Sequence, residues 1–274
     1  MYDKVTEFVK NAGERLREKA GNISDIGVRK DFLTEEDLRI EREFGELIKT
    51  FGPDHRLYAE EEHDFLEASD NLWVMDPISG TSVFMRGMPH YGIVVSHVVK
   101  GQVKFAVVYD PAMRNMYVAE QGKGMFLNGK QQQMAAVDAR LPSTLPEASS
   151  IMHRDTLPAV KVLGLPKVLL FISRVWDQPK LVAQFADALK EFNTYRFPFS
   201  DGVGYAYAAS GQFDGVICLT KDTFPDFAGS LIVKEAGGIF TNREGEDIKP
   251  TDRVFVAAHP SIHGKLLDIV RSIV

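Results

Sequence analysis

The sequence predicts an α/β protein with an α+β N-terminal half and an α/β C-terminal half. Two segments with apolar residues at helical spacing open the chain, and a run of strand-like segments follows between residues 73 and 127. Beyond residue 165, strand-like and helix-like segments alternate. Helices kept apart from strands are typical of α+β structure, and alternation is typical of α/β structure. A chain of 274 residues is long enough for one large domain or two modest domains that share a core.

Two amphipathic helices are expected at the start of the chain. Apolar residues recur at helical spacing early on, which predicts a helix over residues 3–20. The second helix is expected to begin near Thr34, because Thr34 and Asp37 have the spacing of a capping box. Gly52-Pro53 is a natural end for this helix.

Strands are expected in the middle of the chain, where β-branched and aromatic residues gather. Residues 73–76 are interpreted as a short buried strand, and Pro77 is expected to end it because proline has no N–H for a sheet ladder. The further expected strands are residues 92–99, 103–109 and 116–119.

The second half is expected to alternate strands and helices. The expected strands are residues 168–172, 214–219 and 254–258, and the expected helices are residues 178–190, 202–210, 226–236 and 260–274. Residues 131–150 show weak periodicity and contain two prolines, which favours a boundary between a subdomain of residues 1–140 and one of residues 141–274.

Composition excludes several classes of protein. The net charge is −6 and no run of lysine or arginine stands out, so no nucleic-acid polymer is expected as a partner. No apolar run is long enough to span a membrane, and the N-terminus lacks the apolar region of a secretory signal. The one cysteine, Cys218, allows no intrachain disulfide, which agrees with a cytoplasmic location. Cys218 itself is expected to be a buried small apolar residue.

The segment around Asp76 is the strongest candidate for chemistry. Asp76 follows Trp73-Val74-Met75 at the end of the expected strand, and Gly80 and Thr81 come soon after it. A carboxylate at a strand end, beside backbone amides that can face a phosphate, is consistent with a metal and phosphate site.

Three more acids join Asp76 as candidates, although each has a simpler interpretation. Asp37 could only cap its helix, and Asp226 could do the same for the helix that follows it. Glu60 belongs to the run Glu60-Glu61-Glu62, which would usually be a solvated surface. The two histidines near the expected strand 92–99, His90 and His97, fit no compact zinc spacing and are expected to be structural.

Residues 76–81, Asp-Pro-Ile-Ser-Gly-Thr, resemble the Asp-Pro-Ile-Asp-Gly-Thr signature of the inositol monophosphatase family of metal-dependent, lithium-sensitive sugar phosphatases. Residues 58–61 are similar to the family's Gly-Glu-Glu segment. Residues 226–229 and 235–238 are similar to its Trp-Asp-x-Ala-Gly and Glu-Ala-Gly-Gly motifs, with Pro225 in place of the tryptophan. The resemblance covers most of the chain and implies a layered αβαβα sandwich of the sugar-phosphatase type, with the metal and phosphate motifs in residues 1–140.

The resemblance implies a role for each matching residue. The expected ligands of a first metal ion are Glu60, Asp76 and the carbonyl oxygen of Ile78, and those of a second are Asp76 and Asp226. The expected catalytic residues are Glu60 and the pair Thr81 and Asp37, which would orient the attacking water. The expected substrate contacts are Ser79, Gly80, Thr81 and Arg196.

The same resemblance implies Mg²⁺ as the cofactor, Mn²⁺ as a substitute and Li⁺ as an inhibitor. A small phosphorylated metabolite would be the substrate, and the chain would form a homodimer. The substrate stays open among inositol phosphate, fructose bisphosphate, nucleotide bisphosphate and histidinol phosphate, because a fold serves many substrates.

Ser79 separates this chain from the family signature, in which an aspartate stands at that position. A hydroxyl brings an oxygen but no charge, and the affinity of a cation site depends on the charge of its ligands. The second metal ion could bind weakly and need phosphate, hydrolysis could be lost while ligand binding is kept, or the serine could be an engineered knock-out. The predicted function is Mg²⁺-dependent hydrolysis of a small phosphate monoester. The alternative is a catalytically weak or inactive homologue that binds a phosphorylated metabolite or a partner protein.

Overall fold

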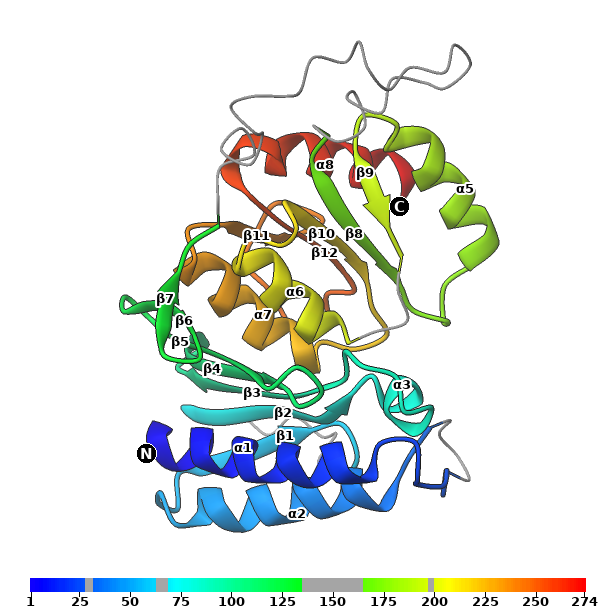
Figure 1. The fold of residues 1–274 in the computed structure, drawn as a ribbon. Helices are drawn as coiled ribbons and strands as arrows, with labels where there is room; N and C mark the ends of the chain where they lie inside the picture. The colour runs from blue at the N-terminus through cyan, green and yellow to red at the C-terminus, as the bar shows by residue number, and fades with distance from the viewer. Residues whose placement is uncertain (28–31, 63–68, 135–164, 197–199) are drawn as a thin grey trace, which may run out of the picture.

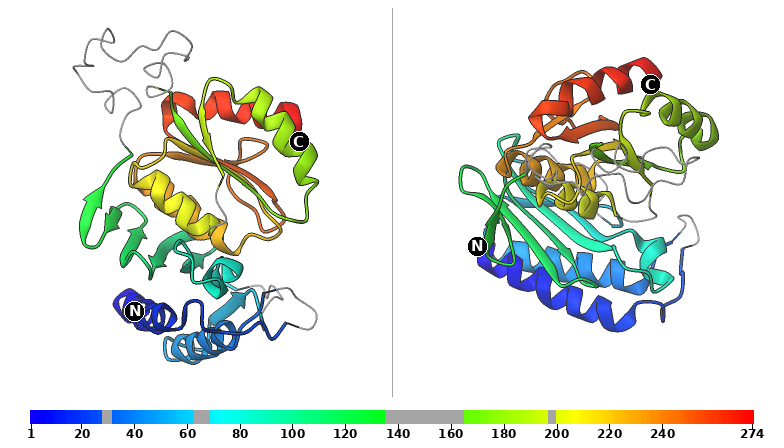
Figure 2. Two further views of the ribbon diagram at one scale, coloured as in Figure 1. Left: turned by 45° about the vertical axis from the view of Figure 1, so that its right-hand side comes forward. Right: turned by 45° about the horizontal axis from the view of Figure 1, so that its top comes forward.

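A computed structural model of the chain describes residues 1–27, 32–62, 69–134, 165–196 and 200–274. Its elements stack in five layers, helix, sheet, helix, sheet and helix (Figure 1). Helices α1 (Tyr2–Lys19) and α2 (Glu35–Lys49) form the first layer, and the C-terminal helix lies in the last. The two views in Figure 2 show the same order of layers. The predicted αβαβα sandwich is therefore confirmed.

The first sheet has seven strands in the order in which they occur in the sequence. Its first two strands pair in parallel, and each later strand is antiparallel to the one before it. The strands are β1 (His55–Ala59), β2 (Asn71–Ser79), β3 (Gly92–Val99), β4 (Gln102–Asp110), β5 (Asn115–Glu120), β6 (Gly124–Leu127) and β7 (Lys130–Gln132).

The second sheet has five strands in the order β11-β12-β10-β8-β9. The strands are β8 (Lys167–Ile172), β9 (Asn193–Tyr195), β10 (Gly215–Leu219), β11 (Ile239–Asn242) and β12 (Val254–Ala258). Strand β10 is parallel to β8 and antiparallel to β12, so this sheet is mixed. Helices α5 (Gln178–Ala188) and α8 (Pro260–Ile273) cover its outer face.

The central layer consists of α6 (Asp201–Ala209) and α7 (Phe224–Glu235), which lie between the two sheets (Figure 1). Every residue of α6 is buried, as a helix packed on all sides requires. The two helices approach closely at Gly229, where an added Cβ would lie 2.3 Å from the ring of Tyr205. Both helices begin beside the ends of strands from the two sheets, and this arrangement places acidic residues from distant segments near one another.

Strand β2 differs from the expectation that Pro77 would end it. The strand continues to Ser79, and its pairing with β3 shifts register between Asp76 and Ser79. Proline is tolerated at such an irregularity because the local ladder is interrupted there. The short elements β1, β6, β7, β9, β11 and the helix α3 (Thr81–Met85) were not expected, since segments of three to six residues carry little periodicity. The expected boundary at residue 140 lies outside the described residues.

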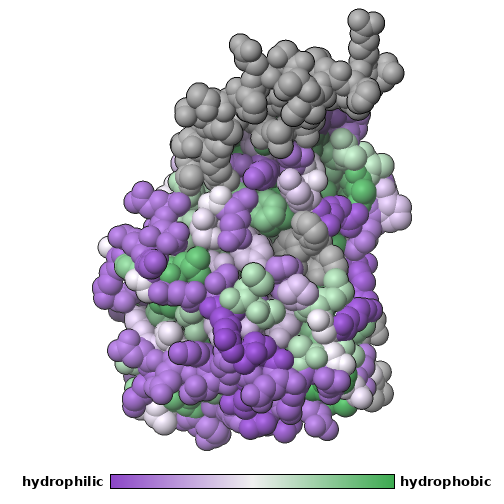
Figure 3. All heavy atoms as spheres, in the orientation of Figure 1, coloured by the Kyte–Doolittle hydropathy of each residue, from purple (hydrophilic) through white to green (hydrophobic). Residues whose placement is uncertain are grey.

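Figure 3 shows that the outer side of the first helical layer is mostly hydrophilic, as expected for helices that meet solvent on one face. Their opposite face supplies Val5, Val9 and Phe44 to a core cluster with Trp73 of β2. Within the parts of the chain that the structure describes, no helix combines the length and apolar character needed to cross a membrane.

Candidate active site

A cavity of about 740 Å³ lies between the two halves of the molecule. Its wall includes residues from the end of β2, the start of α3, the end of β8 and the loop after β10. Among the lining residues are Glu60, Asp76, Ile78, Ser79, Gly80, Thr81, Arg174, Arg196, Asp201, Lys221 and Asp222. Most of the site residues predicted from the sequence therefore face one space.

Gly80 allows the chain to turn from β2 into α3. Its backbone has φ 84°, in the left-handed region that favours glycine. A Cβ at this position would also lie 3.2 Å from the backbone nitrogen of Ser200, which is tighter than an ordinary contact. The turn places Thr81 at the start of α3, where its hydroxyl donates to the carbonyl oxygen of Ile78 at 2.8 Å.

Asp76 and Asp226 are both buried carboxylates, and each has one oxygen without a partner in the part of the chain that the structure describes. Asp226 lies in the first turn of α7, and its Oδ1 accepts a 2.6 Å hydrogen bond from the hydroxyl of Tyr205. Among the described residues, Oδ2 of Asp226 and Oδ1 of Asp76 have no hydrogen-bond partner. Burial, and then the nearby Glu60 carboxylate, raises the pKa of Asp76 well above its usual value. Burial, and then Asp201, does the same to the pKa of Asp226.

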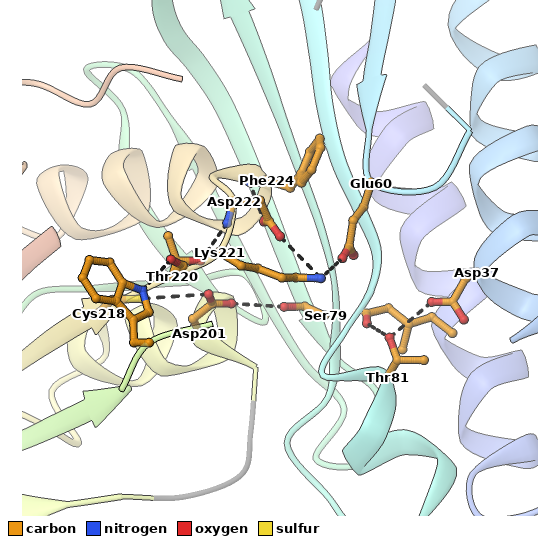
Figure 4. A network of polar contacts seen from close by, with 12 residues as sticks. Asp37, Glu60, Ser79, Thr81, Asp201, Cys218, Thr220, Lys221, Asp222 and Phe224 are labelled. Carbon is orange, nitrogen blue, oxygen red and sulfur yellow. Dashed lines mark hydrogen bonds and ion pairs between the residues drawn. The ribbon is translucent and has the colours of Figure 1, made fainter. Parts of the chain in front are cut away.

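Glu60 is held in place rather than lying in a solvated charge run. The backbone N–H groups of Glu61 and Glu62 donate to the buried carboxylate of Glu41 at 2.9 Å and 2.7 Å. Glu60 Oε1 in turn lies 2.6 Å from the ammonium of Lys221, which reaches across from the loop after β10 (Figure 4). Glu41 therefore anchors the backbone that presents Glu60.

Lys221 forms ion pairs with two acids of the cavity wall. Its Nζ lies 3.6 Å from an oxygen of Asp222 as well as beside Glu60. Burial opposes the charge of Lys221, but Glu60 and Asp222 outweigh it and hold the pKa of the ammonium above its usual value. A positive charge is thus built into the acidic wall of the cavity.

Asp37 takes part in a cap and also contacts Thr81. The predicted capping box is present: Asp37 Oδ2 accepts from the backbone N–H of Thr34 at 2.8 Å and from its hydroxyl at 2.6 Å. The other oxygen of Asp37 lies 3.4 Å from the hydroxyl of Thr81. Burial raises the pKa of Asp37 to about 8, although the hydrogen bonds from Thr34 favour the ionised form.

Asp201 belongs to the cavity, and sequence reasoning missed it. It lies in the first turn of α6 and is buried, and burial raises its pKa to about 7. Ser79 Oγ donates to Asp201 Oδ1 at 3.3 Å (Figure 4). One sequence signal could have found it: an acid directly before an uncharged helix of small residues that has to be buried. Tyr205 and Lys221 were also missed, because the acids that they contact, Asp226 and Glu60, are distant from them in the sequence.

Two histidines, the cysteine and Arg196 are the other residues considered from the sequence. His97 is buried against the ring of Trp73, and burial lowers its pKa to about 4. The ring of His90 bonds to the hydroxyl of Tyr207. Cys218 is buried on β10 as a free thiol. Arg196 is exposed and lines the cavity.

The ligand atoms present fit a hard divalent cation. Such ions prefer carboxylate and carbonyl oxygens, which are the groups that Glu60, Asp76 and Ile78 offer on the cavity wall. A buried carboxylate oxygen without a partner is costly unless something compensates its charge. The unpartnered oxygens of Asp76 and Asp226 are therefore suited to a cation.

Comparisons with known proteins agree with this geometry. The whole chain, residues 1–274, matches the sequence profile of the Inositol monophosphatase family. It is 27% identical over 271 residues to the fructose-1,6-bisphosphatase/inositol-1-monophosphatase of Thermotoga maritima, with 98% of this chain and 94% of that protein covered. It is 28% identical over 275 residues to the Nus factor SuhB of Pasteurella multocida, with 95% of each covered.

Solved structures show the same architecture. The IMPase of Thermotoga maritima superposes with a TM-score of 0.81 at 25% identity, covering 99% of this chain and 97% of that one. A staphylococcal inositol monophosphatase-1, solved as a LiCl-soaked inhibitory complex, gives a TM-score of 0.78 at 20% identity, covering 98% and 94%. At that identity, the second likeness shows the fold alone.

Proposed function

The chain belongs to the inositol monophosphatase family, and from this premise we propose that it hydrolyses a small phosphate monoester with Mg²⁺ bound by carboxylates in and just behind the wall of the cavity. The observation that carries the proposal is the pair of buried carboxylate oxygens, on Asp76 and Asp226, that have no partner among the described residues. Buried carboxylate oxygens without a partner destabilise the folded chain, whereas a bound cation would compensate their negative charge.

The proposed metal ligands are Glu60, Asp76, Asp226 and the carbonyl oxygen of Ile78. When bound, divalent cations supply a water of lowered pKa and positive charge that neutralises the phosphoryl oxygens and the leaving group. Tyr205 fixes the orientation of Asp226 through the 2.6 Å hydrogen bond, and Glu41 fixes the backbone beside Glu60. Mn²⁺ is proposed as a substitute for Mg²⁺ and Li⁺ as an inhibitor.

Thr81 and Asp37 are proposed to orient the attacking water and to accept its proton. Their oxygens lie 3.4 Å apart, and Asp37 is held from its other side by Thr34, so that its carboxylate has one orientation. The backbone amides of Gly80 and Thr81, the hydroxyl of Ser79 and the guanidinium of Arg196 are proposed to hold the phosphate ester. Hydrogen-bond donors that the fold already holds in position can stabilise the transition state without having to move during the reaction.

A binding role without turnover is the second candidate, and two observations favour it. Ser79 places a neutral hydroxyl where the family signature has a carboxylate. Several relatives also carry the name Nus factor SuhB, which is not the name of an enzyme. This second candidate is a protein that binds a phosphorylated metabolite or a partner. The expectation that no nucleic acid takes part stays a prediction.

Phosphate release from a panel of esters tests the proposal. The panel contains inositol phosphate, fructose bisphosphate, a nucleotide bisphosphate and histidinol phosphate. We expect release from at least one ester with Mg²⁺ or Mn²⁺, loss of release with a chelator, and inhibition by Li⁺. Failure of the whole panel, with the protein folded and metal present, would favour the binding role instead.

Lys221→Met is expected to raise the affinity for Mg²⁺ by about three- to tenfold. The ammonium of Lys221 competes with a metal ion for Glu60, which it contacts at 2.6 Å, and a tenfold change corresponds to about 1.4 kcal/mol. Half of the Lys221 side chain is exposed, so solvent screens the pair and the effect stays modest. Isothermal titration with Mg²⁺ measures the change.

The matched control is Lys234→Met. Lys234 is an exposed lysine in the last turn of α7, where it pairs with Asp247. This variant should bind Mg²⁺ like the wild type. If Lys221→Met instead leaves Mg²⁺ affinity unchanged and raises KM for the ester, the ammonium acts on the substrate phosphate rather than against the metal.

Three properties beyond the reaction are also proposed. The single buried thiol of Cys218 supports a reducing, cytoplasmic location. The family resemblance supports a homodimer. The placement of one sheet before residue 134 and the other after residue 165 supports two halves, residues 1–140 and 141–274, that share the cavity.

A further inference from the structure

Two acids and a thiol from three separate elements converge behind the wall of the cavity. Asp201 of α6, Cys218 of β10 and Asp226 of α7 each offer a ligand atom, and these atoms all lie within 4.8 Å of one another. All three side chains are buried. Two carboxylates this close, away from water, repel each other when both are ionised, so the cluster is costly without a cation.

A second observation points to a ligand at this cluster. Asp226 is fully buried, and Tyr205 engages only its Oδ1. Its Oδ2 has no hydrogen-bond partner among the described residues. The neighbouring Asp76 is 5% exposed, and its Oδ1 has no partner either. Acceptors that are buried and unpaired are rare in folded proteins, and a coordinated ion is one of the few groups that satisfies them.

Asp201 stands directly opposite the position at which the signature of this chain departs from that of its family. Ser79 Oγ donates to Asp201 Oδ1 at 3.3 Å, and Figure 4 shows the two side chains facing each other. Ser79 removes one negative charge from the end of β2, and Asp201 adds one from the first turn of α6. A carboxylate from α6 therefore reaches the point at which β2 offers only a hydroxyl.

We propose that Asp201 is a metal ligand that replaces, from α6, the carboxylate that Ser79 lacks on β2. A divalent cation would be held by Asp201 and Asp226, with Asp76 as the shared neighbour. This inference rests on the proposed function, because it concerns the second cation of the same site. It removes the reason to expect that Ser79 weakens catalysis.

Mg²⁺ and Mn²⁺ are the cations that suit this arrangement, since both prefer carboxylate oxygens. Cys218 offers a thiol, which suits softer metals, and its Sγ lies 3.9 Å from Asp201 Oδ2. Cys218 is therefore a neighbour of the site and not one of its ligands.

A purely structural role for Asp201 is the competing interpretation. An acid in the first turn of a helix is stabilising, and Asp201 Oδ1 also accepts from the backbone N–H of Gly202 at 3.0 Å. However, α6 already has a cap, because Ser200 Oγ accepts from the N–H of Val203 at 3.1 Å. A structural role predicts a change in stability alone, whereas a ligand role predicts a change in metal binding.

Mn²⁺ binding to the full chain separates the two roles. Electron paramagnetic resonance and isothermal titration count the bound ions and give the affinity of each. We expect Asp201→Asn, which keeps the shape and the hydrogen bond to Gly202, to weaken one Mn²⁺ site by about 100-fold. Cys218→Ala serves as the matched control at the same cluster and should leave both Mn²⁺ affinities unchanged.

The double variant Ser79→Asp with Asp201→Asn returns the carboxylate to β2. We expect it to recover the wild-type Mn²⁺ affinity to within about threefold, a result that a structural role for Asp201 does not predict. Wild-type binding of Mn²⁺ by Asp201→Asn, or absence of rescue in a folded double variant, overturns the proposal.

Crystals of the wild type grown with Mn²⁺ give an answer even if the variants fail to fold. Anomalous scattering should place an ion about 2.0–2.6 Å from an oxygen of Asp201. Ions found only at Glu60 and Asp76 would reject the role of Asp201. Mn²⁺ bound at Asp201 without hydrolysis of any ester would instead keep this inference and reject the proposed function, whereas metal-dependent hydrolysis with no ion at Asp201 would do the reverse.

Discussion

Asp76→Asn is expected to lower hydrolysis by ~10³-fold or more and, at the same time, to raise the stability of the metal-free protein. The loss corresponds to about 4 kcal/mol of transition-state stabilisation, because Asp76 is the proposed ligand of both cations. The gain in stability follows from burial: Asp76 is 5% exposed, and its Oδ1 has no partner among the described residues. A neutral amide removes the cost of a buried charge, which is about 1–3 kcal/mol.

Phosphate release and chemical unfolding at pH 8, with and without Mg²⁺, measure both effects. Added Mg²⁺ should stabilise the wild type by about 2.7 kcal/mol at a concentration 100 times the dissociation constant, and Asp76→Asn by much less. The control is Asp110→Asn. Asp110 is also buried but accepts hydrogen bonds from Tyr207 and from the N–H of Met113, so its substitution should destabilise the protein. An Asp76→Asn protein that is active, or less stable than the wild type without metal, contradicts the assignment.

Asp37 is expected to make the metal-free protein less stable as the pH rises from about 4 to about 8. Burial raises the pKa of Asp37 to about 8 in the folded chain. Between these values the folded chain keeps a proton that the unfolded chain releases, so the free energy of unfolding falls as the pH rises. The fall is about 1.4 kcal/mol for each pH unit across which the two states differ by one proton. The stabilisation is fully present below pH 4 and is lost as the pH passes 8.

Asp37→Asn should make this slope shallower, although the buried acids Asp76, Asp201 and Asp226 still contribute to it. The variant should also lower turnover by ~10²-fold, while the cap survives because an amide oxygen can still accept from Thr34. Unfolding in urea at pH 5, 6, 7 and 8 gives the slope, and phosphate release gives turnover. Asp177→Asn changes a helix cap at the start of α5 that does not line the cavity, and this control should leave turnover unchanged. If Asp37→Asn keeps both the slope and full turnover, Asp37 is only a cap.

Much of the fold could be predicted from local patterns in the sequence. The apolar spacing of α1 and α2, the capping box at Thr34 and the β-branched runs of β3 and β4 all act over a few residues, so the sequence shows them directly. The short strands β1, β6, β7, β9 and β11 were missed because three to five residues give no clear period. The expectation that Pro77 would end β2 was wrong. The irregular pairing with β3 tolerates a proline there, and this pairing can be seen only in the folded sheet.

The sequence by itself determined the candidate acids, because Glu60, Asp76 and Asp226 lie in ordered motifs that resemble those of one family. Only the tertiary structure decided what surrounds them. Ser79 meets Asp201 across 122 residues, and Glu60 meets Lys221 across 161 residues. A serine at the end of one strand and an acid on a distant helix look unrelated in a linear sequence. They come into contact because the two sheets bury α6 between them, and charges that share a small, poorly solvated space interact strongly whatever their separation along the chain.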